Sequence, residues 1–155
     1  MMYHKPQSAF AMLFTVLVVS LILSIGLAIS NVTLKQTILS SLAKDSQSAF
    51  YQADAGVECG MYQDTTLSNY PRGSAPSAVP ASFTCGGKTM TRNDAASSTD
   101  YFVFTETSLS NASSPCVTII FDKAFSLTQS RVQARGYNRC DSSSRRVERA
   151  LEIKY

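Results

Sequence analysis

Four cysteines carry the chemistry that is easiest to assign in this chain. Cys59, Cys85, Cys116 and Cys140 all follow a long apolar segment near the N-terminus, and none has the C-x-x-C spacing of a zinc or redox site. Disulfide bonds are the favoured interpretation. They require this part of the chain to lie in an oxidising compartment outside the cytoplasm. Free buried thiols are the alternative.

The positions of the cysteines favour one of the three pairings that four cysteines allow. Cys116 and Cys140 flank two consecutive strand-like segments, whereas Cys59 lies near the end of a predicted helix and Cys85 in the first predicted strand. We therefore favour Cys116 with Cys140 and Cys59 with Cys85. The other two pairings stay open.

Arginines near the C-terminus form one charged cluster that could bind a ligand. The candidate contacts to an anionic polymer such as DNA are Arg131, Arg135, Arg145 and Arg146. In a strand, Arg131 and Arg135 share a face with Tyr137, so cations could contact phosphates while the ring stacks on a base. The favoured interpretation is a strand face whose cations pair with Glu148 and Glu152 or with a neighbouring subunit.

Residues suited to catalysis or metal binding are scarce. The single histidine, His4, precedes the apolar segment, so a histidine-based triad or metal site cannot form in the domain that follows. Asp54 and Glu58 are four residues apart and can share a helix face, with Asp64 beyond them, and an exposed helix surface is the favoured interpretation. We expect no enzymatic activity, no cofactor and no metal.

The apolar segment is long enough to cross a membrane. The run Pro6–Leu34 has no charged side chain and spans 29 residues, more than the roughly 20 that a bilayer requires. We expect it to be transmembrane to about residue 32, with its hydroxyl side chains bonded back to helix carbonyls. A cleaved secretory signal is the alternative, but its apolar core is usually shorter.

The apolar segment continues into a two-faced helix without an intervening proline. Beyond Asn31, apolar residues recur in steps of four and seven, which marks one helical face. The residues of this face are Leu34, Ile38, Leu42, Ala49, Ala53, Val57 and Met61. We therefore predict a single helix over residues 10–63, whose second half needs a covering domain.

The remaining chain predicts a small β domain and hence an α+β fold. Residues 64–81 are rich in proline, glycine and serine, and predict a surface connector. Residues 82–155 predict an antiparallel sheet, with a hairpin turn at Gly86-Gly87. The predicted strands are Ser82–Cys85, Lys88–Arg92, Tyr101–Glu106, Cys116–Asp122, Ser130–Asn138 and Arg146–Tyr155.

Charge is divided unevenly along the chain. Asp45–Asp122 holds eight acidic and three basic side chains, a balance of −5, whereas Lys123–Tyr155 holds eight basic and three acidic ones, a balance of +5. Such a split could let the tail of one copy face the middle of another, or let the tail meet an anionic polymer. Solvated surface charge without a partner is the alternative.

Three features of the first 64 residues resemble a known family. They are a short leader ending at Ala9, a hydrophobic helix from Phe10, and the run AFYQADAGVECGMYQD at Ala49–Asp64. Together they resemble the N-terminal region of PilX-type minor pilins, members of the type IV pilin and pseudopilin family. The closing segments GYNRC and RRVERALEIKY are similar to the last strands of such proteins.

The resemblance implies how the chain is processed and where it works. Residues 1–9 would be a leader that a prepilin peptidase removes between Ala9 and Phe10. The helix would hold the protein in the cytoplasmic membrane, with the β domain outside, and pack with other pilin subunits into a filament that could reach the cell surface. Major pilins carry a glutamate at the fifth residue after the cut, where this chain has Phe14, and the leader ends in alanine rather than glycine. The alternative function is a single-pass anchored binding protein that joins no filament.

Overall fold

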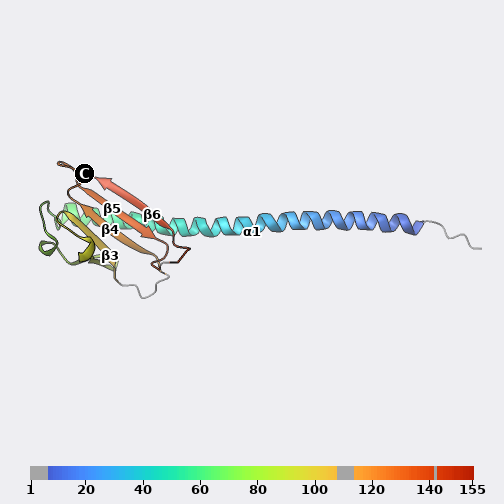
Figure 1. Ribbon diagram of the computed structural model, residues 1–155, viewed down its shortest axis with the longest axis horizontal. Helices are drawn as coiled ribbons and strands as arrows, with labels where there is room; N and C mark the ends of the chain where they lie inside the picture. The colour runs from blue at the N-terminus through green and yellow to red at the C-terminus, as the bar shows by residue number, and fades with distance from the viewer. Residues whose placement is uncertain (1–6, 108–113, 142) are drawn as a thin grey trace, which may run out of the picture. The chain divides into compact units, whose positions relative to one another are not determined.

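The computed structural model describes residues 7–107, 114–141 and 143–155 of the 155-residue chain. One helix, α1, covers Gln7–Met61 and belongs to two compact units, the first reaching Leu42 and the second covering Ala43–Tyr155 (Figure 1). A π-helical turn, Tyr62–Thr66, follows α1 directly, so the predicted helix end at Gln63 falls inside this turn.

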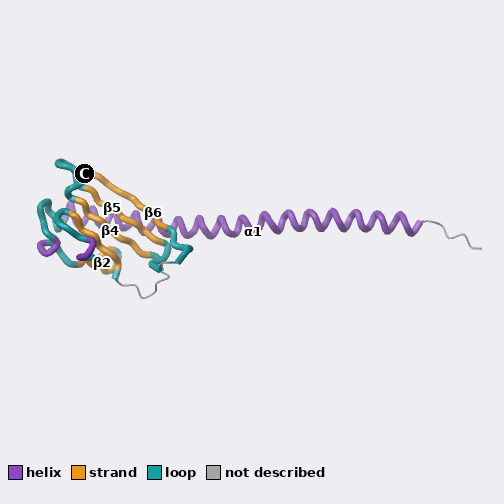
Figure 2. The backbone as a smooth tube through the Cα atoms, viewed as in Figure 1, coloured by secondary structure: helices purple, strands orange, loops and turns teal. Residues whose placement is uncertain are grey.

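The second unit contains six strands in one antiparallel sheet. Consecutive strands are neighbours throughout, in the order β1-β2-β3-β4-β5-β6 (Figure 2). Their bounds are Ser82–Cys85 for β1, Lys88–Arg92 for β2, Tyr101–Glu106 for β3, Cys116–Asp122 for β4, Arg131–Tyr137 for β5 and Glu148–Lys154 for β6. Each lies within two residues of its predicted bounds, and the predicted α+β fold is confirmed.

The turn between β1 and β2 is the predicted glycine hairpin. Cys85 pairs with Lys88 across it, and the φ angles of Gly86 and Gly87 are 54° and 80°. Two consecutive residues with positive φ are typical of a tight hairpin turn, and glycine adopts them without steric penalty. The glycine pair therefore sets the register of β1 against β2.

Alternating side chains of the sheet point toward α1 and form the core. The register pairs Val117 with Gly136 and Ile119 with Ala134 across β4 and β5. The Ile119 and Ala134 side chains are fully buried, as are Ala49 and Ala53 of α1. The sheet thus covers the predicted apolar face of α1 at Ala49, Ala53 and Val57. The earlier members of that face, Leu34, Ile38 and Leu42, are exposed.

The connector also contributes one aromatic side chain to the core. Its Tyr70 is fully buried and stacks on Phe121 with ring centroids 4.2 Å apart. It also makes edge contacts with Phe83 and Phe104. Most of the connector is exposed or half-buried, so Tyr70 is an addition to the predicted surface loop: the aromatic residues of β1, β3 and β4 also need a cover, and the connector supplies a ring for it.

Candidate functional site

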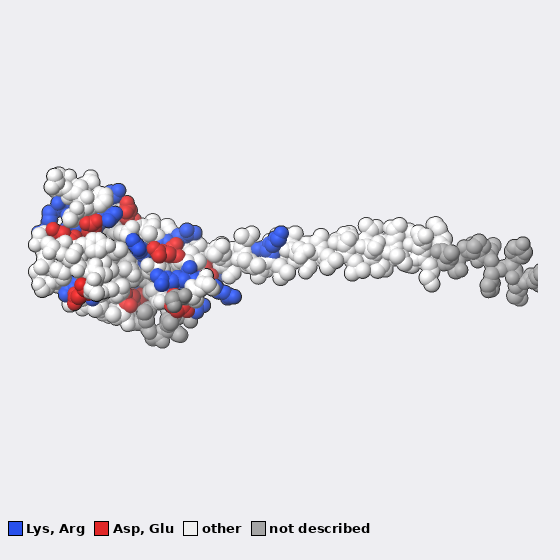
Figure 3. Space-filling view, viewed as in Figure 1, with Lys and Arg blue, Asp and Glu red and all other residues white. Residues whose placement is uncertain are grey.

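The first unit presents a long, mostly apolar surface. Every described side chain from Phe10 to Leu42 is exposed, and most of the large ones are apolar, from Phe10 at 76% to Leu42 at 53%. Figure 3 shows this part of the helix almost free of charged atoms. Within the described residues, α1 is the one helix long and apolar enough to cross a membrane.

Three hydroxyl groups of the predicted membrane span bond back to the helix itself. The hydroxyls of Thr15, Ser20 and Ser24 each donate to the carbonyl oxygen three residues earlier, at 2.8, 2.9 and 2.9 Å. A polar group left without a partner in hydrocarbon costs several kcal/mol, roughly 2–7. These bonds confirm the predicted back-bonding and make the segment compatible with an apolar environment.

The predicted cleavage site lies on the first turns of α1. Ala9 and Phe10 both have helical backbone, and the Phe10 side chain is exposed. Phe14, the fifth residue after the predicted cut, is exposed too. Cleavage between Ala9 and Phe10 stays a prediction.

Small residues let the second half of α1 approach the sheet closely. A methyl group added at Gly56 would lie 2.6 Å from Val117, and one added at Gly60 would lie 2.8 Å from Val132. On the sheet side, a methyl group at Gly136 would lie 2.1 Å from the Ala49 carbonyl oxygen. Backbone therefore contacts backbone at this point, which only glycine permits without displacement.

This close contact gives a physical meaning to the run that carries the family resemblance. Within AFYQADAGVECG, the small residues Ala49, Ala53, Gly56 and Gly60 lie on the buried face of α1, whereas Asp54 is exposed. The periodicity identified the apolar face but missed the glycines, because they add no hydrophobic signal. Their three- to four-residue spacing along the same face was the signal available.

Two disulfides tie the second unit together in the pairing favoured from the sequence. Cys59 of α1 bonds to Cys85 of β1, and Cys116 of β4 bonds to Cys140 after β5, with Cα–Cα distances of 5.9 and 5.8 Å. The first bond links the helix to the sheet edge. The second links the two ends of the β4–β5 hairpin.

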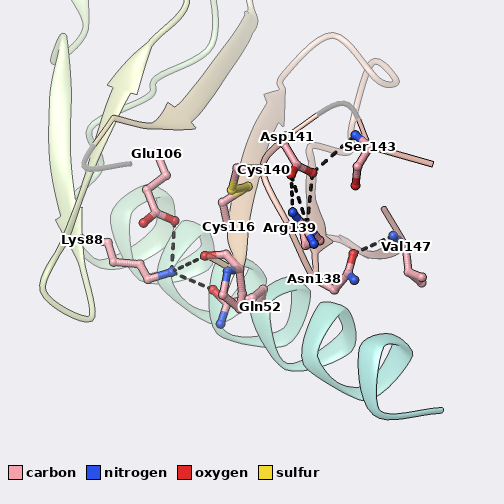
Figure 4. The surroundings of a disulfide bond; sticks show 11 residues. Gln52, Lys88, Glu106, Cys116, Asn138, Arg139, Cys140, Asp141, Ser143 and Val147 are labelled. Atoms are coloured by element: carbon pink, nitrogen blue, oxygen red, sulfur yellow. Dashed lines mark hydrogen bonds and ion pairs between the residues drawn. A yellow bond between two sulfur atoms is a disulfide. The ribbon is translucent and has the colours of Figure 1, made fainter. Parts of the chain in front are cut away.

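A lysine next to the second disulfide joins helix, sheet and loop. Lys88 Nζ of β2 donates to Gln52 Oε1 of α1 at 2.9 Å, to Glu106 Oε2 of β3 at 3.0 Å and to the Pro115 carbonyl oxygen at 3.1 Å (Figure 4). Three acceptors satisfy the three protons of the ammonium. The contact is therefore structural and leaves no free cation for a ligand.

The turn between β5 and β6 is braced by its own side chains. Asn138 Oδ1 accepts from the Val147 amide at 2.6 Å, and Arg139 Nη2 donates to Asp141 Oδ2 at 2.6 Å (Figure 4). Hydrogen bonds from Arg139 and then from Ser143 lower the pKa of Asp141 below its ordinary value. The base of this turn is held in one conformation by these bonds and by the adjacent disulfide.

The arginines on β5 are paired with carboxylates of the neighbouring strands. Arg131 contacts Asp122 at 2.8 Å and Glu152 at 3.7 Å, and Arg135 contacts Glu148 at 3.9 Å. These contacts agree with the favoured interpretation, in which this strand face pairs with glutamates of β6. Contact of these arginines with an anionic polymer stays a prediction.

The other two arginines belong to the turn between β5 and β6. Arg145 and Arg146 are exposed in the turn before β6, and the Arg146 guanidinium lies 3.9 Å from the Tyr137 ring centroid. Tyr137 itself is 8% exposed, so little of its ring surface remains for a base. Stacking of the Tyr137 ring on a base is therefore not favoured by this arrangement.

A buried ion pair was missed by the sequence analysis. Asp64 was expected on an exposed helix face, but it is 6% exposed and forms an ion pair with Lys123, whose Nζ also lies 3.4 Å from Tyr155 Oη. The π-helical turn after α1 directs Asp64 inward. Burial raises the pKa of Asp64, and the hydrogen bond from Lys123 opposes that shift. The two residues are 59 positions apart, so no local spacing could indicate the pair.

Asp54 and Glu58 are exposed, as expected. Among the described residues, no group of three or more histidine, cysteine, aspartate or glutamate side chains could hold a metal ion.

Comparisons with protein-family models, with curated proteins and with solved structures find no match to this chain. The architecture is nevertheless pilin-like: a long N-terminal helix, apolar in its first half, packs through its second half on an antiparallel sheet that carries two disulfides.

Proposed function

We propose that this chain is a minor pilin or pseudopilin, a structural subunit of a type IV pilus or of a filament like that of type II secretion. It acts by assembly through its N-terminal helix, and it is not an enzyme. Its partners are the membrane, a prepilin peptidase and other pilin subunits.

One observation carries this proposal: the apolar surface of α1 is longer than a membrane requires. About 20 residues from Phe10 suffice to span the hydrocarbon core, yet Leu34, Ile38, Leu39 and Leu42 beyond them are 53–68% exposed. A helix that only anchors a domain does not need this apolar extension. A helix that leaves lipid and packs into a bundle of like helices needs it, because both environments accept the same apolar surface.

The disulfides support the proposed location. Both lie in the unit that follows the apolar segment, and such bonds persist in oxidising compartments. The β domain is therefore outside the cytoplasm, and the apolar helix anchors it to the cytoplasmic membrane in a single pass.

The rival function is an anchored DNA-binding protein that joins no filament. The contacts of Arg131 and Arg135 with acidic side chains leave less positive charge for phosphates, and DNA affinity comes mainly from such charge. Assembly is therefore the better supported function.

Processing separates the two functions. The full chain, expressed in membranes with an active prepilin peptidase, is expected to begin at Phe10 by intact mass, and with an inactive peptidase it keeps its leader. Protease added to spheroplasts is expected to reach the β domain. A chain that stays uncut with the active enzyme supports the anchored binding protein, and a β domain shielded until the cells are lysed contradicts the proposed location.

A further inference from the structure

The side of α1 that faces away from the sheet carries an unusual combination of side chains in the second unit. Phe50 and Tyr51 are 43% and 58% exposed, and their rings meet edge to face with centroids 6.3 Å apart. Asp54 and Glu58 are exposed one and two turns farther along the same side. These four residues form what is called here the acidic stripe.

The acids of this stripe lack the partners that most other acids of the unit have. Within the described part of the chain, neither Asp54 nor Glu58 forms an ion pair. The acidic residues that do form one are Asp64, Asp94, Glu106, Asp122, Asp141, Glu148 and Glu152. Two free carboxylates beside two exposed rings make a surface suited to guanidinium groups, which pair with carboxylates and stack on aromatic faces.

The same chain offers such guanidinium groups at another place. Arg145 and Arg146 are both exposed, and the Arg145 side chain forms no ion pair among the described residues. The tail that carries them has a balance of +5, against −5 for the segment that carries the stripe. The two surfaces are therefore complementary in charge.

These two surfaces cannot meet within one copy. Arg149 Nε at the start of β6 donates to Ser46 Oγ at 2.9 Å, and the other end of β6 lies near Asp64, because Lys123 contacts both Asp64 and Tyr155. The turn before β6 thus lies beside Ser46 or nearer to the N-terminal end of α1. Asp54 and Glu58 lie 8 and 12 residues farther along the helix, or about 12–18 Å at 1.5 Å per residue.

We propose that the acidic stripe docks the Arg145–Arg146 turn of a second copy of this chain, displaced by about 12–18 Å along the helix direction. The inference rests on the proposed function and names one of its subunit contacts. Because the two surfaces differ, the contact is heterologous. Repeating it builds an open-ended filament when the rotation that relates one copy to the next does not close into a ring.

Zero-length cross-linking between two copies tests this contact. One full-length copy carries R145K together with D54N and E58Q, so that the amine at position 145 cannot react with the acidic stripe of its own copy. The other copy is unchanged and carries a different tag. In membranes that hold both, a carbodiimide is expected to link the substituted position 145 to Asp54 or Glu58 of the unchanged copy. A matched copy with L127K in place of R145K places an amine at an equally exposed site, since Leu127 is 98% exposed, and is expected to give no such link.

Charge reversal measures the same contact without a cross-linker. E58R in every copy is expected to lower co-purification of the two tagged forms by about fivefold or more, in the range of one or two exposed ion pairs. R145E in every copy is expected to lower co-purification to a similar extent. When every copy carries both E58R and R145E, the two charges are exchanged, and most of the co-purification is expected to return. Raising the salt from about 0.05 to 0.5 M should weaken the unchanged contact.

The outcomes separate this inference from the proposed function. A chain that is cut before Phe10 and assembles, but gives no link from R145K to the stripe, overturns the docking contact and leaves the proposed function standing. A link formed by a chain that is never cut supports the contact and contradicts the proposed function. DNA binding that is lost with R145E and R146E, in the absence of the link, also overturns the contact.

Discussion

The close contact between α1 and β5 should make Gly136 the least replaceable glycine of the chain. In G136A, the new methyl group would lie 2.1 Å from the Ala49 carbonyl oxygen and 2.4 Å from the Ala53 amide nitrogen. Both atoms belong to the helix backbone, so no side-chain rotation can relieve the overlap. The helix must move away from the sheet, and the buried contacts on either side of it loosen.

The expected loss of unfolding free energy is larger for G136A than for substitutions of the two glycines on α1. Overpacking a core usually costs about 1–3 kcal/mol, and the backbone contact places G136A at about 3 kcal/mol or above. G56A and G60A meet side chains at 2.6 and 2.8 Å, which can partly adjust, so about 1–2 kcal/mol is expected for each. For a unit of this size, 1 kcal/mol shifts Tm by about 4 °C, which predicts a fall of roughly 12 °C for G136A.

Thermal unfolding of the full chain in detergent micelles measures the Tm of each glycine variant and so ranks their losses of stability. The chain has no tryptophan and seven tyrosines, so near-ultraviolet circular dichroism of the tyrosines reports tertiary packing. G26A is the matched control, because nothing lies within 4 Å of the added methyl group, and its Tm is expected to equal that of the unchanged chain. A G136A variant that melts within 2 °C of G26A, about half a kcal/mol, would refute the close-contact argument.

Three further predictions concern the buried pair and a disulfide. K123M leaves Asp64 buried without its cation and is expected to lower the free energy of unfolding by about 3–5 kcal/mol, whereas D64L/K123M should recover much of that loss; equal losses in chemical denaturation would contradict the pairing. Because burial raises the pKa of Asp64 above its ordinary 3.8, the folded state holds this proton more tightly. The resulting stability is full below pH 3.8 and is lost as the pH rises through the folded pKa, so the Tm of the unchanged chain minus that of D64N should grow from pH 7 to pH 4.5. A constant or falling difference would argue against the raised pKa. Replacing Cys59 and Cys85 by serine opens a loop of sequence separation 26, with an expected loss of about 3.5 kcal/mol in the chain-entropy estimate; an unchanged unfolding midpoint would show that this bond contributes little.

The elements of the fold were predictable because their signals are local. The period of apolar residues predicted a helix to Gln63, the alternation of side chains predicted all six strands, and the Gly86-Gly87 pair predicted the first hairpin. The disulfide pairing followed from the same elements, since each bond joins segments whose ends the strand order brings together. Local patterns of this kind survive tertiary packing when they agree with it.

The parts that were missed depend on contacts between distant segments. Asp64 and Lys123 meet only because a π-helical turn directs the first inward, and Tyr70 is buried only because β1, β3 and β4 offer it an aromatic surface. No spacing within a short window contains these partners.

Photo-cross-linking from the apolar helix tests most directly whether α1 works as an assembly surface. A photoreactive phenylalanine analogue is placed at Ile38, which is 68% exposed and lies beyond the predicted membrane span, and the full chain is expressed in its native cells. We expect adducts with other pilin-like subunits, formed only when the prepilin peptidase is active. Adducts with lipid alone, or protein adducts that are unchanged when the peptidase is inactive, would contradict this expectation.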